Sequence, residues 1–223
     1  MDYVIIVAGG SGKRMGSEIP KQFLLLNDKP ILMHTIETFV NAVDGIEVIV
    51  VLPENQVSFW KALCTKYNFC VDHHIVYGGD ERYHSVENGL KTIKGKGVVA
   101  VHDGVRPFVS KQIILNSFAK ARELNAVTLA VPLKDSIREV QGGESKALNR
   151  ADYQLIQTPQ VFDVDLLKKA FNSPYQATFT DDASVVEAYG SKVHLIQGDY
   201  NNIKITSPED MIFGEAILNA LTL

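Results

Sequence analysis

The chain has 223 residues, of which 46% are hydrophobic and 22% are charged. This composition excludes a disordered chain and indicates a globular protein with a substantial core. The formal net charge of −4 argues against general binding of nucleic acid or membrane surfaces, so any anion site must be a local concentration of cations. Cys64 and Cys70 have neither zinc nor disulfide-framework spacing, and the short apolar N-terminal run has no basic segment before it. We therefore expect a cytoplasmic protein.

The first two thirds of the chain alternate between two hydrophobic patterns. Near-continuous apolar runs predict strands buried on both faces at 3–8, 46–52, 73–77, 98–103 and 126–132. Amphipathic segments such as 30–40 and 85–93 predict helices between them. This alternation predicts a single α/β domain over 1–223, with a Rossmann-like, doubly wound and mostly parallel sheet.

The pattern changes at 133–160, which is polar and contains two extended stretches around "QGGES". This predicts an extended β-hairpin arm at about 133–160 that leaves the domain. Helical patterns return at 163–172 and 181–190, and a strand pair is expected near 192–206. Ser207, Pro208 and Glu209 predict the start of a last helix, with Ser207 as the N-cap.

A glycine-rich segment, "VAGGSGKRMG", follows the first predicted strand. Such a turn lies at the carboxyl edge of the sheet, where its backbone N–H groups and neighbouring cations can bind phosphate. The Walker A pattern fails because Arg14 follows Lys13, and the dinucleotide fingerprint fails because Met15 stands where a glycine is needed. Alone, the loop indicates an anion site, with a surface turn bearing solvated cations as the alternative.

Six motifs occur in a fixed order along the chain. The loop and its "PKQF" are followed by "GGDERYHSVENGL", "VHDGVRPF", "QTPQVF", "TDDASVVEAYG" and "NNIKITSPEDM". Together they closely resemble the 2-C-methyl-D-erythritol 4-phosphate cytidylyltransferase family, over essentially all 223 residues. Members of this family commonly have Ala-Ala-Gly where this chain has Ala8-Gly9-Gly10, a change that should loosen the loop without removing an N–H donor.

The resemblance implies that CMP is transferred from CTP to a sugar-alcohol phosphate, with release of pyrophosphate. It implies catalytic roles for Arg14, Lys21, Lys204 and Arg150. It assigns nucleotide binding to Ala8, Gly9, Gly10, Gly12, Gly79, Asp80 and Ser85. It assigns substrate binding to Asp103, Arg106, Ser136, Arg150 and Thr158.

The expected cofactor is Mg²⁺, with Asp103 as its protein ligand, because a cation that bridges phosphates usually takes only one or two carboxylates. His102 has no partner at metal-ligand spacing, so we expect it to pack beside the strand end. Asp181 and Asp182 form a carboxylate pair, but we favour a structural role for them at a helix N-terminus capped by Thr180. The role of Lys13 stays open.

A homodimer is also expected, because the resemblance implies that the arm contributes Ser136, Arg150 and Thr158 to the partner's site. An isolated hairpin is marginal in water, which agrees with packing on a second copy. Two alternatives remain, a ribitol-5-phosphate cytidylyltransferase and a non-catalytic nucleotide-binding regulator. Retention of Arg14, Lys21 and Lys204 disfavours the regulator. We expect no nucleic-acid or membrane partner.

Overall fold

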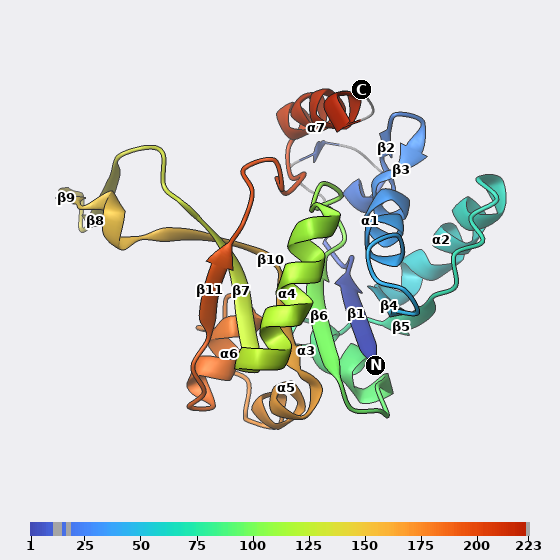
Figure 1. Ribbon diagram of the computed structural model, residues 1–223. Helices are drawn as coiled ribbons and strands as arrows, with labels where there is room; N and C mark the ends of the chain where they lie inside the picture. The colour runs from blue at the N-terminus through green and yellow to red at the C-terminus, as the bar shows by residue number, and fades with distance from the viewer. Residues whose placement is uncertain (11–14, 17–18, 222–223) are drawn as a thin grey trace.

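The computed structural model describes residues 1–10, 15–16 and 19–221, and in these residues seven strands form one twisted sheet (Figure 1). The strands in spatial order are β11 (His194–Gln197), β7 (Ala126–Pro132), β10 (Gln154–Asp163), β6 (Val98–Asp103), β1 (Asp2–Val7), β4 (Glu47–Leu52) and β5 (His74–Tyr77). All neighbours pair in parallel except β10, which is antiparallel to both β6 and β7. The five strands expected from the apolar runs and the mostly parallel, Rossmann-like sheet are confirmed.

Helices cover both faces of this sheet, which is why its strands are apolar on both sides. One face packs against α1 (Ile31–Val40), α2 (Glu54–Lys66) and α4 (Lys111–Leu124). The other face packs against α3 (Arg82–Thr92), α5 (Val164–Phe171) and α6 (Asp182–Ala188). Successive residues of β1 alternate between the two cores, since Val4 and Ile6 join the first while Tyr3 and Ile5 join the second.

The arm is a hairpin of β8 (Ile137–Gln141) and β9 (Glu144–Leu148), which projects far from the sheet (Figure 1). Its turn uses Gly142 and Gly143, both with positive φ, as the "QGGES" motif predicts. The projecting part is shorter than the expected 133–160. After a 3-10 turn at Arg150–Asp152, the chain returns as β10 and fills the gap between β6 and β7. The sequence analysis did not predict β10 as a strand, because its first residues are mostly polar and form no apolar run.

The C-terminal region differs from expectation in one respect. Of the strand pair expected near 192–206, only β11 forms, although Ile205 N donates to Val105 O at 2.9 Å. The last helix, α7 (Pro208–Leu221), begins where expected, with Ser207 Oγ accepting from Asp210 N at 3.4 Å. It packs near the short hairpin of β2 (Leu25–Leu26) and β3 (Lys29–Pro30). No helix among the described residues is long and apolar enough to cross a membrane.

Candidate active site

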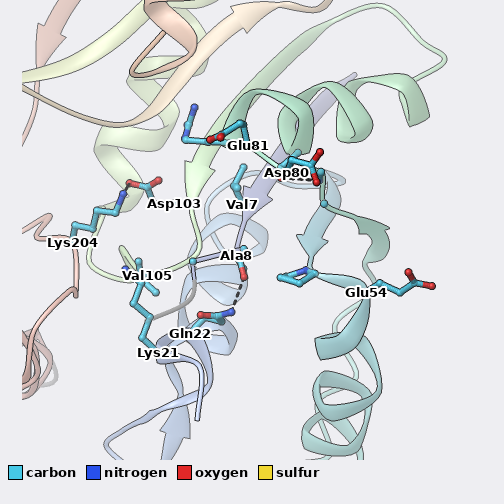
Figure 2. Close-up of a pocket in the computed structure, with 17 residues that line it drawn as sticks. Val7, Ala8, Lys21, Gln22, Glu54, Asp80, Glu81, Asp103, Val105 and Lys204 are labelled. Atoms are coloured by element: carbon cyan, nitrogen blue, oxygen red, sulfur yellow. Dashed lines mark hydrogen bonds and ion pairs between the residues drawn. The ribbon is translucent and has the colours of Figure 1, made fainter. Parts of the chain in front are cut away.

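A cavity of about 440 Å³ opens at the carboxyl ends of β1, β4, β5 and β6 (Figure 2). The chain winds from β1 outward to β4 and β5, then crosses back to β6 on the other side of β1. In open α/β sheets, ligands bind at such a reversal of winding. Residues that follow four separate strands therefore meet at one edge. In Figure 2, Asp103 and Lys204 lie on one side of the cavity and Asp80 and Glu54 on the other, with Lys21 and Gln22 below.

The glycine-rich loop forms one wall through Ala8, Gly9 and Gly10. A Cβ on Gly10 would lie 3.2 Å from Lys21 Cε, so the lysine stem runs directly over the loop backbone. The next residue, Gln22, is buried and donates from Nε2 to Ala8 O at 2.7 Å. This bond, absent from the sequence-based reasoning, ties "PKQF" to the end of β1 and so sets the place of Lys21. Gly12, Lys13 and Arg14 lie outside the described residues.

The opposite wall comes from the turn after β5, where Gly79 N donates to Ser85 Oγ at 3.1 Å. A Cβ on Gly79 would lie only 2.4 Å from His84 Cβ, which is far inside van der Waals contact. Only glycine allows this turn to lie against the first turn of α3. Gly79, Asp80 and Ser85 therefore share the cavity with the loop of β1, as expected for a nucleotide site.

Asp103, the last residue of β6, is the centre of a charge cluster. Its Oδ2 lies 3.0 Å from both Lys204 Nζ and Arg106 Nε, although Lys204 is 101 residues away in the chain. Burial alone would raise the pKa of this carboxyl group. The cations Lys204, Arg82 and Arg106 outweigh burial and hold the pKa of Asp103 well below its ordinary value. The group is thus an anion at neutral pH, and its ion pair with Lys204 is a contact that the sequence analysis did not predict.

A second cavity of about 250 Å³ adjoins the first and shares Arg82, Asp103 and Lys204 with it. Arg106 and Thr158 line this second cavity. Arg106 Nη1 also donates to Asn202 O at 2.8 Å, so its guanidinium is held from two sides. Two cavities therefore meet at a common group of charged side chains.

Thr158 does not belong to the projecting arm, which corrects its expected contribution to a partner's site. It lies on β10 at an irregularity in register between Gln157 and Gln160, and it is buried in its own sheet. Thr158 Oγ1 accepts from Asp103 N at 3.1 Å. The residue therefore lines the second cavity of the same chain.

Ser136 and Arg150 lie near the root of the hairpin, exposed and outside both cavities of their own chain. Arg150 Nη1 donates to Lys134 O, across the two chain segments that lead into the hairpin. The Lys134 ammonium lies 3.6 Å from the centre of the Tyr200 ring, and Tyr200 precedes Lys204 on the same loop. The root of the hairpin is thus braced against the loop that carries Lys204.

His102 has the packing role expected for it. It is fully buried, its ring lies edge-on to Phe39, and its Nε2 donates to Arg106 O at 2.9 Å. Its Nδ1 then accepts from the Thr158 hydroxyl at 3.1 Å. Burial lowers the pKa of His102 to about 4, so the ring is neutral at physiological pH.

Arg82 is the main site residue that the sequence analysis missed. It lines both cavities and donates from both Nη atoms to Asp182, at 2.9 and 2.6 Å. The available signal was that Arg82 is the single cation of the "GGDERYHSVENGL" motif. The cap of α6 is Asp181 rather than the expected Thr180, because Asp181 Oδ1 accepts from Ser184 N in a capping box.

The side chains of the site are compatible with a Mg²⁺ ion that takes most of its oxygen ligands from a bound phosphate compound and water. Among the described residues, no cluster of three or more His, Cys, Asp or Glu side chains is placed to hold a metal by itself. Asp103 is the ionised carboxylate that both cavities share. A phosphate-bridging Mg²⁺ needs only one or two protein carboxylates, and phosphates and water supply its other oxygens.

A glycine-lined cavity at the winding reversal of a Rossmann-like sheet, with Lys21, Arg82 and Lys204 in its lining, is typical of a nucleotidyltransferase architecture. The family model for IspD, 2-C-methyl-D-erythritol 4-phosphate cytidylyltransferase, matches residues 3–220. The chain belongs to this family.

Relatives and solved structures agree with the family match. The chain is 49% identical to the enzyme of that name from Phocaeicola vulgatus, over 97% of this chain and 99% of the relative. It is 48% identical to the one from Bacteroides thetaiotaomicron, over 96% and 98%. The structure of 4-diphosphocytidyl-2C-methyl-D-erythritol synthase from Anaerococcus prevotii superposes with a TM-score of 0.82 at 30% identity, covering 98% of each chain. The Thermus thermophilus cytidylyltransferase gives 0.77 at 28% identity, over 98% of this chain and all of the other.

Proposed function

We propose that the chain transfers CMP from CTP to 2-C-methyl-D-erythritol 4-phosphate, giving 4-diphosphocytidyl-2-C-methyl-D-erythritol and pyrophosphate for non-mevalonate isoprenoid biosynthesis. The observation that carries this proposal is the junction of two cavities at Asp103, Lys204 and Arg82. One cavity has the backbone-rich wall that suits a nucleotide, and the other has the cationic wall that suits a phosphorylated acceptor.

The reaction forms one P–O bond and breaks another. A phosphate oxygen of the acceptor attacks the α-phosphorus of CTP, and the bond from that phosphorus to the bridging oxygen of the β-phosphate breaks. Pyrophosphate leaves with the bonding electrons. The attacking phosphate is already ionised, so the step needs charge neutralisation and in-line placement rather than a general base.

Lys21 and Lys204 supply positive charge from two sides of the nucleotide cavity. We assign Lys21 to the triphosphate near the glycine loop and Lys204 to the reacting phosphate, with Arg14 as a further cation of the loop. We assign recognition of a pyrimidine base, in preference to a purine, to the close backbone of Ala8, Gly9 and Gly79. Asp80 and Ser85 complete that wall.

The acceptor occupies the second cavity, with its phosphate directed to Arg106 and Thr158. Asp103 holds Arg106 and Lys204 by the same carboxylate oxygen, so it fixes the spacing between the two binding spaces. Mg²⁺ would be held by Asp103 and the CTP phosphates. When bound, it neutralises phosphate charge and favours departure of pyrophosphate.

The functional unit is proposed to be a homodimer in the cytoplasm. Exposed apolar side chains on and beside the arm, namely Val140, Tyr153, Leu155 and Ile156, support an interface with a second copy. Ser136 and Arg150 would then reach the partner's second cavity. Both cysteines are free, which agrees with a reducing compartment.

Subunit mixing tests the shared site. Arg14→Ala removes a nucleotide contact and Arg150→Ala removes an arm contact, so heterodimers of the two inactive variants should contain one intact site. Activity should therefore return after subunit exchange. If heterodimers form and no activity returns, Arg150 does not act on the partner.

The function itself is tested by pyrophosphate release from CTP with two acceptors, 2-C-methyl-D-erythritol 4-phosphate and ribitol 5-phosphate. Turnover is expected with the first. Turnover with ribitol 5-phosphate alone would show that the proposed acceptor is wrong. Binding of CTP without turnover of either acceptor would indicate a nucleotide-binding module.

A further inference from the structure

Asp182 makes an ion pair that is not needed to cap its helix. Asp181 already fills the N-cap position of α6, and Ser184 completes the capping box. Asp182 points elsewhere. Its side chain is 1% exposed, and its two carboxylate oxygens accept from the two Nη atoms of Arg82, 100 residues earlier. A helix-capping role therefore leaves this carboxylate unexplained.

The backbone below Asp182 is fixed as firmly as the side chain. Gln160 of β10 accepts at Oε1 from the N–H groups of Asp182 and Ala183, at 3.0 and 2.9 Å. The same side chain donates from Nε2 to Asp181 Oδ2 at 2.7 Å. The start of α6 is thus fixed to the sheet, and from this backbone the carboxylate of Asp182 contacts Arg82.

Stability alone is a weak reason for this arrangement. Removing two charges from water costs free energy, and a buried ion pair often contributes no more than well-packed apolar residues would. What the pair does achieve is geometric. A bidentate contact fixes the plane of a guanidinium, which a single contact leaves free to turn.

The guanidinium that is fixed in this way lies at the junction of the two cavities. Arg82 lines both the nucleotide cavity and the second cavity, and its side chain is 30% exposed. Two of its N–H groups are committed to Asp182, and the other donors of the fork remain for a ligand. Asp103, the shared carboxylate, is close enough to Arg82 to interact with it electrostatically.

We infer that Asp182 is a positioning residue that holds the Arg82 guanidinium between the two cavities, so that its remaining N–H groups face phosphate oxygens there. The inference rests on the proposed function, because it assumes that phosphates occupy both spaces. Asp182 acts through Arg82 and contacts neither substrate.

The test compares two conservative variants. Asp182→Asn keeps the side-chain shape but offers only one oxygen, so the fork is no longer fixed. Arg82→Lys keeps the cation beside Asp182 and loses the planar fork, which also avoids leaving a buried carboxylate without a cation. Each should lower kcat/KM for the acceptor by about tenfold or more, and the double variant should lose no more than the worse single one.

Asp2→Asn is the matched control, because Asp2 pairs with both of its oxygens to Arg122 Nη2, at 2.7 and 2.5 Å, at the start of β1 and away from both cavities. It should leave kcat and KM unchanged. Thermal unfolding is measured for every variant. If Asp182→Asn and Arg82→Lys lower only the unfolding temperature, with wild-type kcat and KM, Asp182 is structural and the inference is wrong.

Calorimetric titration with CTP and Mg²⁺ separates this inference from the proposed function. If the wild type turns over neither acceptor, the proposed function fails, and the Kd for CTP still reports on Arg82. A Kd raised by about tenfold in both variants and unchanged in Asp2→Asn supports the positioning role. An unchanged Kd together with unchanged kinetics overturns it.

Discussion

Acidification should destabilise the protein through His102, which lies directly beneath the charge cluster. The ring donates from Nε2 to Arg106 O and accepts at Nδ1 from Thr158, whose oxygen in turn accepts from Asp103 N. This chain of bonds needs a neutral ring. A proton on Nδ1 would turn this atom from an acceptor into a donor and break its hydrogen bond from the Thr158 hydroxyl. Because His102 is fully buried, water cannot replace the lost bond.

The magnitude follows from the difference between folded and unfolded protein. The pKa of His102 is lowered from 6.5 to about 4, mainly by burial. The unfolded chain therefore binds the proton more readily, and the stabilising contribution is fully present above pH 6.5. It is lost as pH falls from 6.5 toward about 4, and amounts to about 3 kcal/mol in all, of which about 2.5 kcal/mol is lost by about pH 4.5.

Two other buried groups, Asp103 and Asp182, also change the stability of the fold with pH, in opposite directions. The pKa of Asp103 is lowered, so its contribution is lost only below its ordinary value of 3.8. Burial raises the pKa of Asp182, against the opposing effect of Arg82, and protonation of Asp182 in acid therefore opposes the loss of stability. The effect of His102 is isolated by comparing the wild type with His102→Asn, which does not titrate in this range.

Urea denaturation between about pH 7 and about pH 4.5 measures the difference. The variant should be less stable near neutrality, because it loses packing and a hydrogen bond. Its free energy of unfolding should nevertheless fall by about 2.5 kcal/mol less than that of the wild type over this range. Parallel pH profiles for the two proteins would refute the reasoning, since they would mean that His102 takes up no proton on unfolding.

Three further predictions concern the nucleotide cavity. Lys21→Ala should lower kcat by about 100-fold, a loss of about 3 kcal/mol of transition-state stabilisation, with an unchanged unfolding temperature; steady-state kinetics that match the wild type would remove Lys21 from the mechanism. Gly79→Ala should raise KM for CTP and destabilise the fold by about 1–3 kcal/mol, because its Cβ would meet His84 Cβ at 2.4 Å. Gly9→Ala, whose Cβ would lie 4.0 Å from Pro53, should leave the unfolding temperature nearly unchanged, and equal shifts in the two variants would contradict the steric argument. CTP should be used in strong preference to ATP and GTP in a pyrophosphate-release assay, and comparable turnover of a purine nucleotide would contradict the assignment of the base pocket.

The amino-acid sequence by itself determined the scaffold and the place of the site. Apolar runs predicted five strands of the sheet, β1, β4, β5, β6 and β7. A strand buried on both faces leaves little choice of residue type, so its sequence is recognisable. The glycine-rich loop after β1 located the binding edge, since that edge is a consequence of strand direction. Its motifs also led to the correct family. These features are local, so a single chain read in order reveals them.

Tertiary structure decided which side chains meet. β10 reads as polar at its start, yet it enters the centre of the sheet because its neighbours leave a space with unpaired backbone groups there. That placement brings Thr158 to Asp103 and moves it from the expected arm into its own chain's cavity. Likewise, the pairing of Arg82 with Asp182 joins residues 100 positions apart. No local pattern encodes such a contact, because its free energy depends on the path of the chain and on burial from water, which exist only after folding.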